Sequence, residues 1–396
     1  MKLIYQQTRR VLSVLLMGLA FTLSWGQANA QHDIRGLAGD TFNLYAFPFN
    51  INLPEGSSLQ MRGFGDQDAG ANATHAAGDG YNLPQYPGPT LVVNEGDTVT
   101  INLTNSGVPH PVSIVVTGHN VTATRTDGNP SHGLVTEAAS VGESVSYTFD
   151  APEPGTYLYH SLDGSTPGLH VEMGLLGVLV VRPDPTTNTD RTAYGDGTET
   201  DYEQEFLYLL TEVDPEIHLQ MERGHVTHFT NSDRFAKIWF VNGRVFPDLF
   251  QGDYNPLFPH QPYQSLALAE PGDRVLVRNI NAGHDSHPFH YHGENLRFVG
   301  RDGRMLSSNG LVADLGRSDN TINSAPKQAV DAIWTWTGKD LNWDIYGHDT
   351  AHTCNDSDGD GFGDNLDPLL PTTYEHEYCA DHGKPFPVTL PGAGEL

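Results

Sequence analysis

The chain has 396 residues and a formal net charge of −28 at pH 7, from 49 acidic side chains against 21 lysines and arginines. Such a surface argues against nucleic acid and anionic membranes as partners, and its main effect is to keep the protein in solution. The 42 glycines and 26 prolines separate β-branched runs, and no segment keeps a helical apolar period over three turns. The sequence therefore predicts an all-β protein.

Residues 1–30 predict an export signal. Arg9 and Arg10 precede an apolar run at residues 11–23, which leads to a small-residue cleavage site at residues 28–30. The run is too short for a typical membrane span, which is the alternative. Cleavage removes three positive charges and no acid, so the mature chain carries about −31 rather than −28. We expect a periplasmic or secreted protein without a membrane anchor, exported by the Sec or the twin-arginine route.

Residues 87–105, PGPTLVVNEGDTVTINLTN, predict a pair of strands joined by a turn at residues 95–97. Parts of this first half recur in the second half in the same order. The matching pairs are Gly96-Asp97 with Gly272-Asp273, His110-Pro111 with His287-Pro288, residues 144–149 with 329–334, and residues 157–160 with 344–348. The repeat implies two copies of one fold.

The repeat also sets the expected domain boundaries. We expect the two copies at residues 31–182 and 202–350. Residues 183–201, rich in Thr, Asp, Asn and Gly, predict a linker between them. Residues 351–396 then form an insertion followed by a closing segment.

Residues 287–293, HPFHYHG, carry the clearest signal for chemistry. Because side chains alternate between the faces of a strand, His290 and His292 share one face, and His287 lies just upstream at the strand entrance. Three clustered imidazoles without a nearby nucleophile suit a transition metal such as copper or zinc. A surface histidine cluster without a metal is the alternative.

Together, the strand pair and the histidine cluster resemble the multicopper oxidase and copper nitrite reductase superfamily, including two-domain laccase-like enzymes, over roughly residues 40–350. The resemblance implies two cupredoxin-like Greek-key β-sandwich domains in tandem, copper as cofactor, and a homotrimer with copper sites between subunits. It assigns His287 to an electron-entry (type 1) copper, and His290 and His292 to the oxygen-reducing cluster.

Several positions that the resemblance makes copper ligands have changed in the first copy. Only His110 remains of the early ligand slot, where Ser113 replaces the second imidazole. In the late slot, Ser161 follows His160 where copper nitrite reductases have a cysteine, and His170 stands at the other type 1 histidine position. Because type 1 copper depends on a thiolate, we expect no type 1 site here.

The resemblance gives His160 a second role, at a type 2 copper completed by a histidine of a neighbouring subunit. His290 or His292 is the candidate for that histidine, and packing of His160 at a strand end is the alternative. In the second copy, His348 is a further candidate copper ligand. The family's oxygen-reducing cluster uses four His-x-His pairs and this chain has one, which excludes a complete four-copper site within one subunit.

Cys354 and Cys379 are the only cysteines, and an exported protein meets an oxidising compartment, so we expect them to form a disulfide. The competing assignment makes Cys379 a copper thiolate beside His382, at the C-x-x-H spacing of single-domain blue copper proteins. The two assignments exclude each other, because only the second needs a free sulfur.

Residues 356–367, DSDGDGFGDNLD, place carboxylates at loop positions 1, 3, 5, 9 and 12 and a glycine at position 6. This is an EF-hand-like calcium pattern, and its final aspartate makes it resemble thrombospondin type 3 repeats. A merely acidic turn is the alternative. We expect calcium bound by Asp356, Asp358, Asp360, Asp364 and Asp367.

Two functions follow from these residues. The first is a copper-dependent oxidoreductase of the multicopper oxidase type with an incomplete ligand set, in which electrons enter at His287 and leave at His290 and His292. The second is a cupredoxin-derived metal-binding or structural protein without turnover. The missing type 1 cysteine and cluster histidines leave enzyme activity open, and no residue pattern names a reducing substrate.

Overall fold

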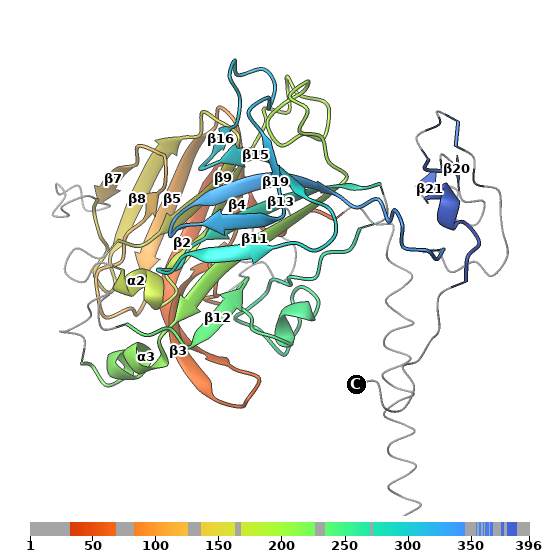
Figure 1. Cartoon of the computed structure of the whole chain (residues 1–396). Helices are drawn as coiled ribbons and strands as arrows, with labels where there is room; N and C mark the ends of the chain where they lie inside the picture. Colours follow the sequence, from red (N-terminus) through yellow and green to blue (C-terminus); the bar gives the residue numbers. More distant parts are fainter. Residues whose placement is uncertain are drawn as a thin grey trace, which may run out of the picture. The chain divides into compact units, whose positions relative to one another are not determined.

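The computed structural model describes residues 32–68, 83–125, 136–162, 168–225, 234–269 and 272–344, together with parts of 354–385 (Figure 1). The chain divides into two compact units. The larger comprises Asp33–Ala267 and Arg274–Trp334, and the smaller comprises Met1–His32, Leu268–Asp273 and Thr335–Leu396. The larger unit therefore holds most of both halves of the predicted repeat, but Gly272, Asp273 and Asp344 of the second half belong to the smaller unit.

The first half of the larger unit contains two five-stranded sheets. One sheet has the order β1 (Leu37–Ala38), β4 (Leu91–Asn94), β10 (Leu176–Arg182), β9 (Gly155–His160) and β6 (Val115–Val116). The other has the order β3 (Ser58–Asp66), β2 (Thr41–Asn52), β5 (Thr98–Asn105), β8 (Ser144–Asp150) and β7 (Thr122–Arg125). Figure 1 shows β7, β8, β5 and β2 side by side in this order. The predicted strand pair at residues 87–105 corresponds to β4 and β5.

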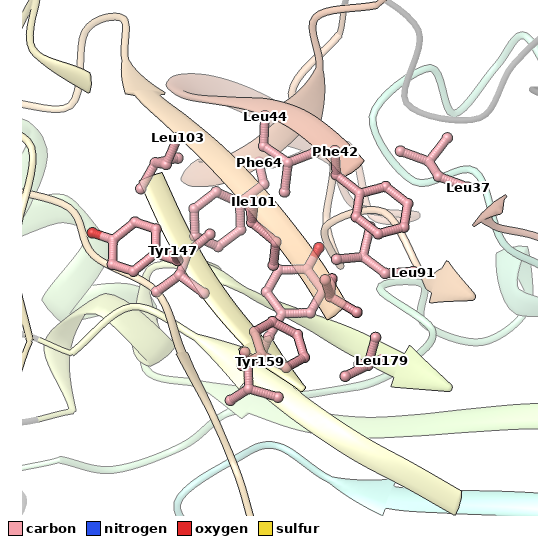
Figure 2. Close-up of a cluster of buried hydrophobic side chains, with 14 of the residues drawn as sticks. Leu37, Phe42, Leu44, Phe64, Leu91, Ile101, Leu103, Tyr147, Tyr159 and Leu179 are labelled. Atoms are coloured by element: carbon pink, nitrogen blue, oxygen red, sulfur yellow. The ribbon is translucent and has the colours of Figure 1, made fainter. Parts of the chain in front are cut away.

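The hydrophobic core of this half follows from the alternation of side chains along its strands. In β5, Ile101 and Leu103 are buried, whereas Asn102 between them is half-buried. Alternation directs the apolar side chains to one face of the sheet, where they pack against the other sheet. Figure 2 shows these side chains in the same cluster as Tyr159. Tyr159 keeps its hydroxyl satisfied by donating to the carbonyl oxygen of Pro89 at 2.6 Å.

The second half contains a seven-stranded sheet and a separate two-stranded ribbon. The sheet has the order β12 (Ile238–Val241), β11 (Gln204–Val213), β13 (Arg274–Asn281), β19 (Ala329–Thr335), β15 (Leu296–Arg301) and β16 (Arg304–Met305), and β17 (Arg317–Asp319) pairs with β15. The ribbon pairs β14 (His287–His290) with β18 (Thr321–Ser324). The prediction of an all-β protein is confirmed.

Helices are short throughout the described residues. They are α2 (Leu169–Glu172), α3 (Pro215–Glu222) and single 3-10 turns at Asp248–Phe250 and Cys379–Asp381. Helix α3 begins at Pro215 because the Asp214 carboxylate accepts the amide of Glu216, and proline is favoured in a first turn. None of these helices has the length and apolar character needed to cross a membrane.

Buried polar groups join the two halves within the larger unit. Arg278 on β13 donates from Nε to Glu205 Oε1 at 2.6 Å and from Nη1 to Thr156 Oγ1 on β9 at 3.0 Å. Asp331 on β19 accepts from the hydroxyls of Thr156 and Tyr194, each at 2.6 Å. Because a buried charge is tolerated only when it is paired and hydrogen-bonded, these bonds fix β9 against the sheet of the second half.

In the smaller unit, Cys354 and Cys379 form a disulfide with their Cα atoms 5.6 Å apart, which confirms the prediction. The Cys379 sulfur is therefore not a thiolate, and the competing assignment of a copper site beside His382 is wrong. The described residues of this unit also include β20 (Asn365–Leu366), which pairs with β21 (Tyr374–Glu375).

Candidate metal site

The HPFHYHG sequence forms β14 and the residues after it, with His287 as the first strand residue. The register of the ribbon places His287 opposite Ser324 and His290 opposite Thr321. His287 and Phe289 are half-buried, whereas His290 and His292 are exposed. The three histidines therefore divide between the two faces of the strand.

Aromatic side chains fix the inner face of this strand. The ring of Phe289 lies 5.1 Å from that of Tyr208 on β11 and 5.4 Å from that of Tyr291, measured between centroids. Tyr291 in turn lies 6.2 Å from Trp334 on β19. Because these alternate residues pack inward, the residues between them are directed to solvent.

The structure brings His290 and His292 together on the outer face. Their ring centroids are 4.9 Å apart and their planes are inclined by 68°. The Nδ1 atom of His290 lies 2.9 Å from Thr321 Oγ1 across the ribbon. Two adjacent imidazoles of this kind can offer two nitrogen donors to one borderline metal ion.

His287 faces the other way and joins a buried carboxylate. Its Nε2 donates to Glu212 Oε2 at 2.6 Å, and the opposite oxygen, Oε1, accepts the amides of His284 and Asp285 at 2.6 and 3.0 Å. Burial alone raises the pKa of Glu212, but these hydrogen bonds and the positive charge of Arg234 reverse the effect and hold the pKa below its ordinary value. Glu212 is therefore an anion that anchors the start of β14.

Arg234 links this carboxylate to a second one from the first half. Its Nη2 donates to Glu212 Oε1 at 2.9 Å and its Nε to Glu172 Oε2, at the end of α2, at 2.7 Å. Burial raises the pKa of Glu172 to about 7, against the opposing effect of Arg234. The ring nitrogens of His218 and His284 lie 3.8 and 3.9 Å from the Glu172 carboxylate oxygens.

Arg234 carries the positive charge that pairs with both carboxylates, Glu172 and Glu212. Burial lowers the pKa values of His218 and His284 to about 4, so both rings are neutral at pH 7. Across the described ranges, no group of three or more His, Cys, Asp or Glu side chains has an arrangement that could hold a metal ion. We therefore interpret this network as structural.

In the first half, the ligand slot is closed by neutral hydrogen bonds. Ser161 Oγ lies 2.7 Å from Nδ1 of His170 and accepts the amide of Ser113 at 3.0 Å. Ser113 in turn donates its hydroxyl to the carbonyl oxygen of Leu162 at 3.0 Å. Ser161 and His170 thus lie together, as the family pattern requires, but the soft sulfur that type 1 copper needs is replaced by a hydroxyl. This donor set does not fit a type 1 copper.

His160 is buried next to this slot on β9. Its Nδ1 donates to the carbonyl oxygen of Ser161 at 3.0 Å. Burial, and then the charge of Lys327, lowers the pKa of His160 to about 4. The Lys327 ammonium lies near enough to disfavour a second cation at this ring.

Other predicted site residues lie outside the described residues. These are His348 and the calcium candidates Asp358, Asp360, Asp364 and Asp367. Asp356 is described, and its carboxylate accepts the amides of Gly359 at 2.6 Å and Gly361 at 3.0 Å.

Sequence reasoning missed the acids and the arginine behind His287. In the structure, a Cβ atom at Gly283 would clash with Oε2 of Glu212, so a larger residue would require this carboxylate to shift. Arg234 lies 22 residues from Glu212 in another segment, and no periodic pattern connects the two.

Comparison with known protein families gives a match in the first half. Residues 71–186 match the sequence model of the multicopper oxidase family. The multicopper oxidase MCE of Talaromyces pinophilus is 39% identical over 102 residues, which are 25% of this chain and 15% of that protein. The chain therefore matches only a small part of the length of this relative.

Solved structures share the fold over a larger part of the chain. The blue copper oxidase from Nitrosomonas europaea has a TM-score of 0.51 and 21% identity, covering 75% of this chain and 76% of its own. The copper nitrite reductase from the same organism has a TM-score of 0.51 and 18% identity, covering 76% and 85%. These similarities confirm the predicted cupredoxin-like β-sandwich fold. The comparisons therefore show a segment similar to multicopper oxidases at residues 71–186 and a shared fold over about three quarters of the chain.

Proposed function

We propose that this protein is a copper-binding, multicopper-oxidase-like oxidoreductase that holds copper at His290 and His292. The observation that carries the proposal is the pair of exposed imidazoles, with centroids 4.9 Å apart on one face of β14. Neutral imidazole is a common metal ligand, and two such ligands leave coordination positions for further donors or a substrate. The multicopper oxidase match at residues 71–186 supports copper rather than zinc as the ion.

The bound copper would supply one-electron chemistry, and the chain would hold and orient it. His160 of a neighbouring subunit is a candidate for a third ligand, but Lys327 beside His160 works against a cation there. Water would complete the coordination.

We propose no type 1 copper and assign His287 to anchoring β14. Its Nε2 is bound to Glu212, and the only two cysteines of the chain are joined to each other. No thiolate is therefore left to give a blue copper its soft ligand. Electrons would have to reach the His290–His292 copper directly from the reducing substrate, so we expect weak turnover of simple phenols.

We further propose an exported homotrimer with a calcium ion in residues 356–367. The export signal predicted at residues 1–30 supports the first point, and the hydrogen bonds that the Asp356 carboxylate accepts from two glycine amides support a turn there. The N-terminal residue of the exported protein, its mass in solution and its calcium content test these proposals separately.

The copper proposal is tested by the double substitution His290→Ala/His292→Ala. We expect the wild-type protein to bind copper without intense blue colour, and the double variant to lose at least about a hundredfold in affinity. His225→Ala, at an exposed histidine after α3, is the matched control and should bind like the wild type. Equal copper content in the double variant and the wild type would show that the ion is held elsewhere.

A further inference from the structure

The hydrogen-bonded partner of His290 lies on the opposite strand of the ribbon. Thr321 is its register partner, and Thr321 Oγ1 is 2.9 Å from Nδ1 of His290. The Thr321 hydroxyl donates to Oδ1 of Asn320 at 2.9 Å. The main-chain oxygen of Asn320 accepts the amide of Tyr291 at 2.9 Å, so this residue is itself tied to β14.

The protons of this chain of hydrogen bonds can be assigned. A threonine hydroxyl has one proton, and here Asn320 Oδ1 accepts it. Thr321 Oγ1 can then only accept from the imidazole, so the His290 proton is on Nδ1. In the neutral ring, Nε2 therefore carries the lone pair.

We infer that Asn320 and Thr321 are positioning residues that prepare Nε2 of His290 for copper. The inference rests on the proposed copper site at His290 and His292. The two nitrogens of an imidazole lie on opposite sides of the ring, so holding Nδ1 against the ribbon turns Nε2 outward. An exposed, untethered ring would rotate and exchange between two tautomers, and metal binding would have to select one of them.

The ribbon also explains why threonine suits this role. Its β-branched side chain favours a strand and restricts χ1, so the hydroxyl is held toward the opposite residue. Asn320 stands just before β18 and supplies the acceptor that determines the direction of the Thr321 proton. The arrangement thus orients one copper ligand without adding a charge to the site.

The test compares Thr321→Val with Thr321→Ser in the full-length protein. Valine keeps the β-branched shape but cannot accept the Nδ1 proton, whereas serine retains a hydroxyl. We expect copper(II) affinity, measured by competition with a chelator of known affinity at pH 7.5, to fall about tenfold in Thr321→Val. Thr321→Ser should stay close to the wild type, and Asn320→Ala should lose about threefold because the hydroxyl proton is no longer directed.

A second measurement needs no copper. Nitrogen-15 chemical shifts of the His290 ring should show a proton on Nδ1 in the wild type and a mixture of tautomers in Thr321→Val. Thr104→Val is the matched control, since Thr104 makes a similar cross-strand hydroxyl contact, with Ser144, in the first half. This control should change neither the His290 shifts nor the copper affinity.

The outcomes separate the inference from the function on which it rests. A wild-type protein that binds no copper, or binds it equally after His290→Ala/His292→Ala, rejects the proposed function and with it the positioning role. A wild type that needs both histidines, with unchanged affinity and an unchanged His290 tautomer in Thr321→Val, rejects the positioning role alone.

Discussion

The late ligand slot of the first half and the early ligand slot of the second half are stabilised in opposite ways. In the first half, the side chains of Ser161 and His170 are buried and bonded to each other at 2.7 Å. In the second half, His290 and His292 stand exposed with their rings in contact. The side chains of the first slot are buried, whereas the second slot presents nitrogen donors to solvent.

The difference shows what each slot needs in order to be stable without a metal. The hydroxyl of Ser161 and the imidazole of His170 bond to each other without a charged group, so the first slot can close around them. In the second half, the outer histidines are exposed to solvent. The strand that carries them is fixed by charged groups, because both His287 and Arg234 donate hydrogen bonds to the Glu212 carboxylate. Breaking a charged anchor should therefore cost more than altering a neutral one.

The largest effect is expected for Glu212→Gln. This change removes the buried anion and leaves the Arg234 charge with a weaker partner, which should lower the free energy of unfolding by about 4 kcal/mol. Chemical denaturation measures the effect. Glu203→Gln is the matched control, because Glu203 pairs with Arg274 at the surface and should matter by less than about 1 kcal/mol. Equal effects of the two substitutions would contradict the role of the buried network.

A smaller, pH-dependent effect is expected for His218→Asn. Burial lowers the pKa of His218 from 6.5 to about 4. Between these two pH values, His218 is therefore protonated in the unfolded chain and neutral in the folded chain. The stability contributed by this neutral ring is present above pH 6.5 and is lost as the pH falls toward 4, up to about 3 kcal/mol. Asparagine can replace the bond from Nδ1 to the carbonyl oxygen of Gln60 without titrating.

The measurement is the slope of unfolding free energy against pH between 6 and 4.5. It should be shallower in His218→Asn than in the wild type by about one bound proton. His225→Asn, at an exposed histidine, should leave the slope unchanged. An identical slope in all three proteins would show that His218 is already protonated in the folded state.

The comparison of the two slots also shows which features the sequence could predict. Strands β5 and β8 were predictable because apolar side chains alternate within them, and the loss of the first slot was predictable because Ser161 stands where the family has cysteine. The placement of His290 and His292 on one face follows from the same alternation. The partners of His287 were not predictable. Glu212 lies 75 residues away, and its burial depends on the charged and hydrogen-bonding groups around it, which no periodic pattern in the sequence reveals.

The smallest effect on stability, and a direct test of how far the first slot has closed, is expected for Ser161→Cys. The sulfur weakens the bonds to the Ser113 amide and to His170, at a cost of about 1 kcal/mol, but restores the thiolate that the slot lacks. If the loss of the sulfur alone abolished copper binding, added copper(II) should now give the intense visible absorption of a copper thiolate. Ser146→Cys, on β8, supplies a cysteine away from the slot and should stay colourless.

Colour in both variants would indicate nonspecific binding to a thiol. Absence of colour in Ser161→Cys would mean that restoring the sulfur does not restore copper binding. Copper would then have to displace packed side chains and the surrounding hydrogen bonds, including that of Ser113 to Leu162, and not only a single hydroxyl.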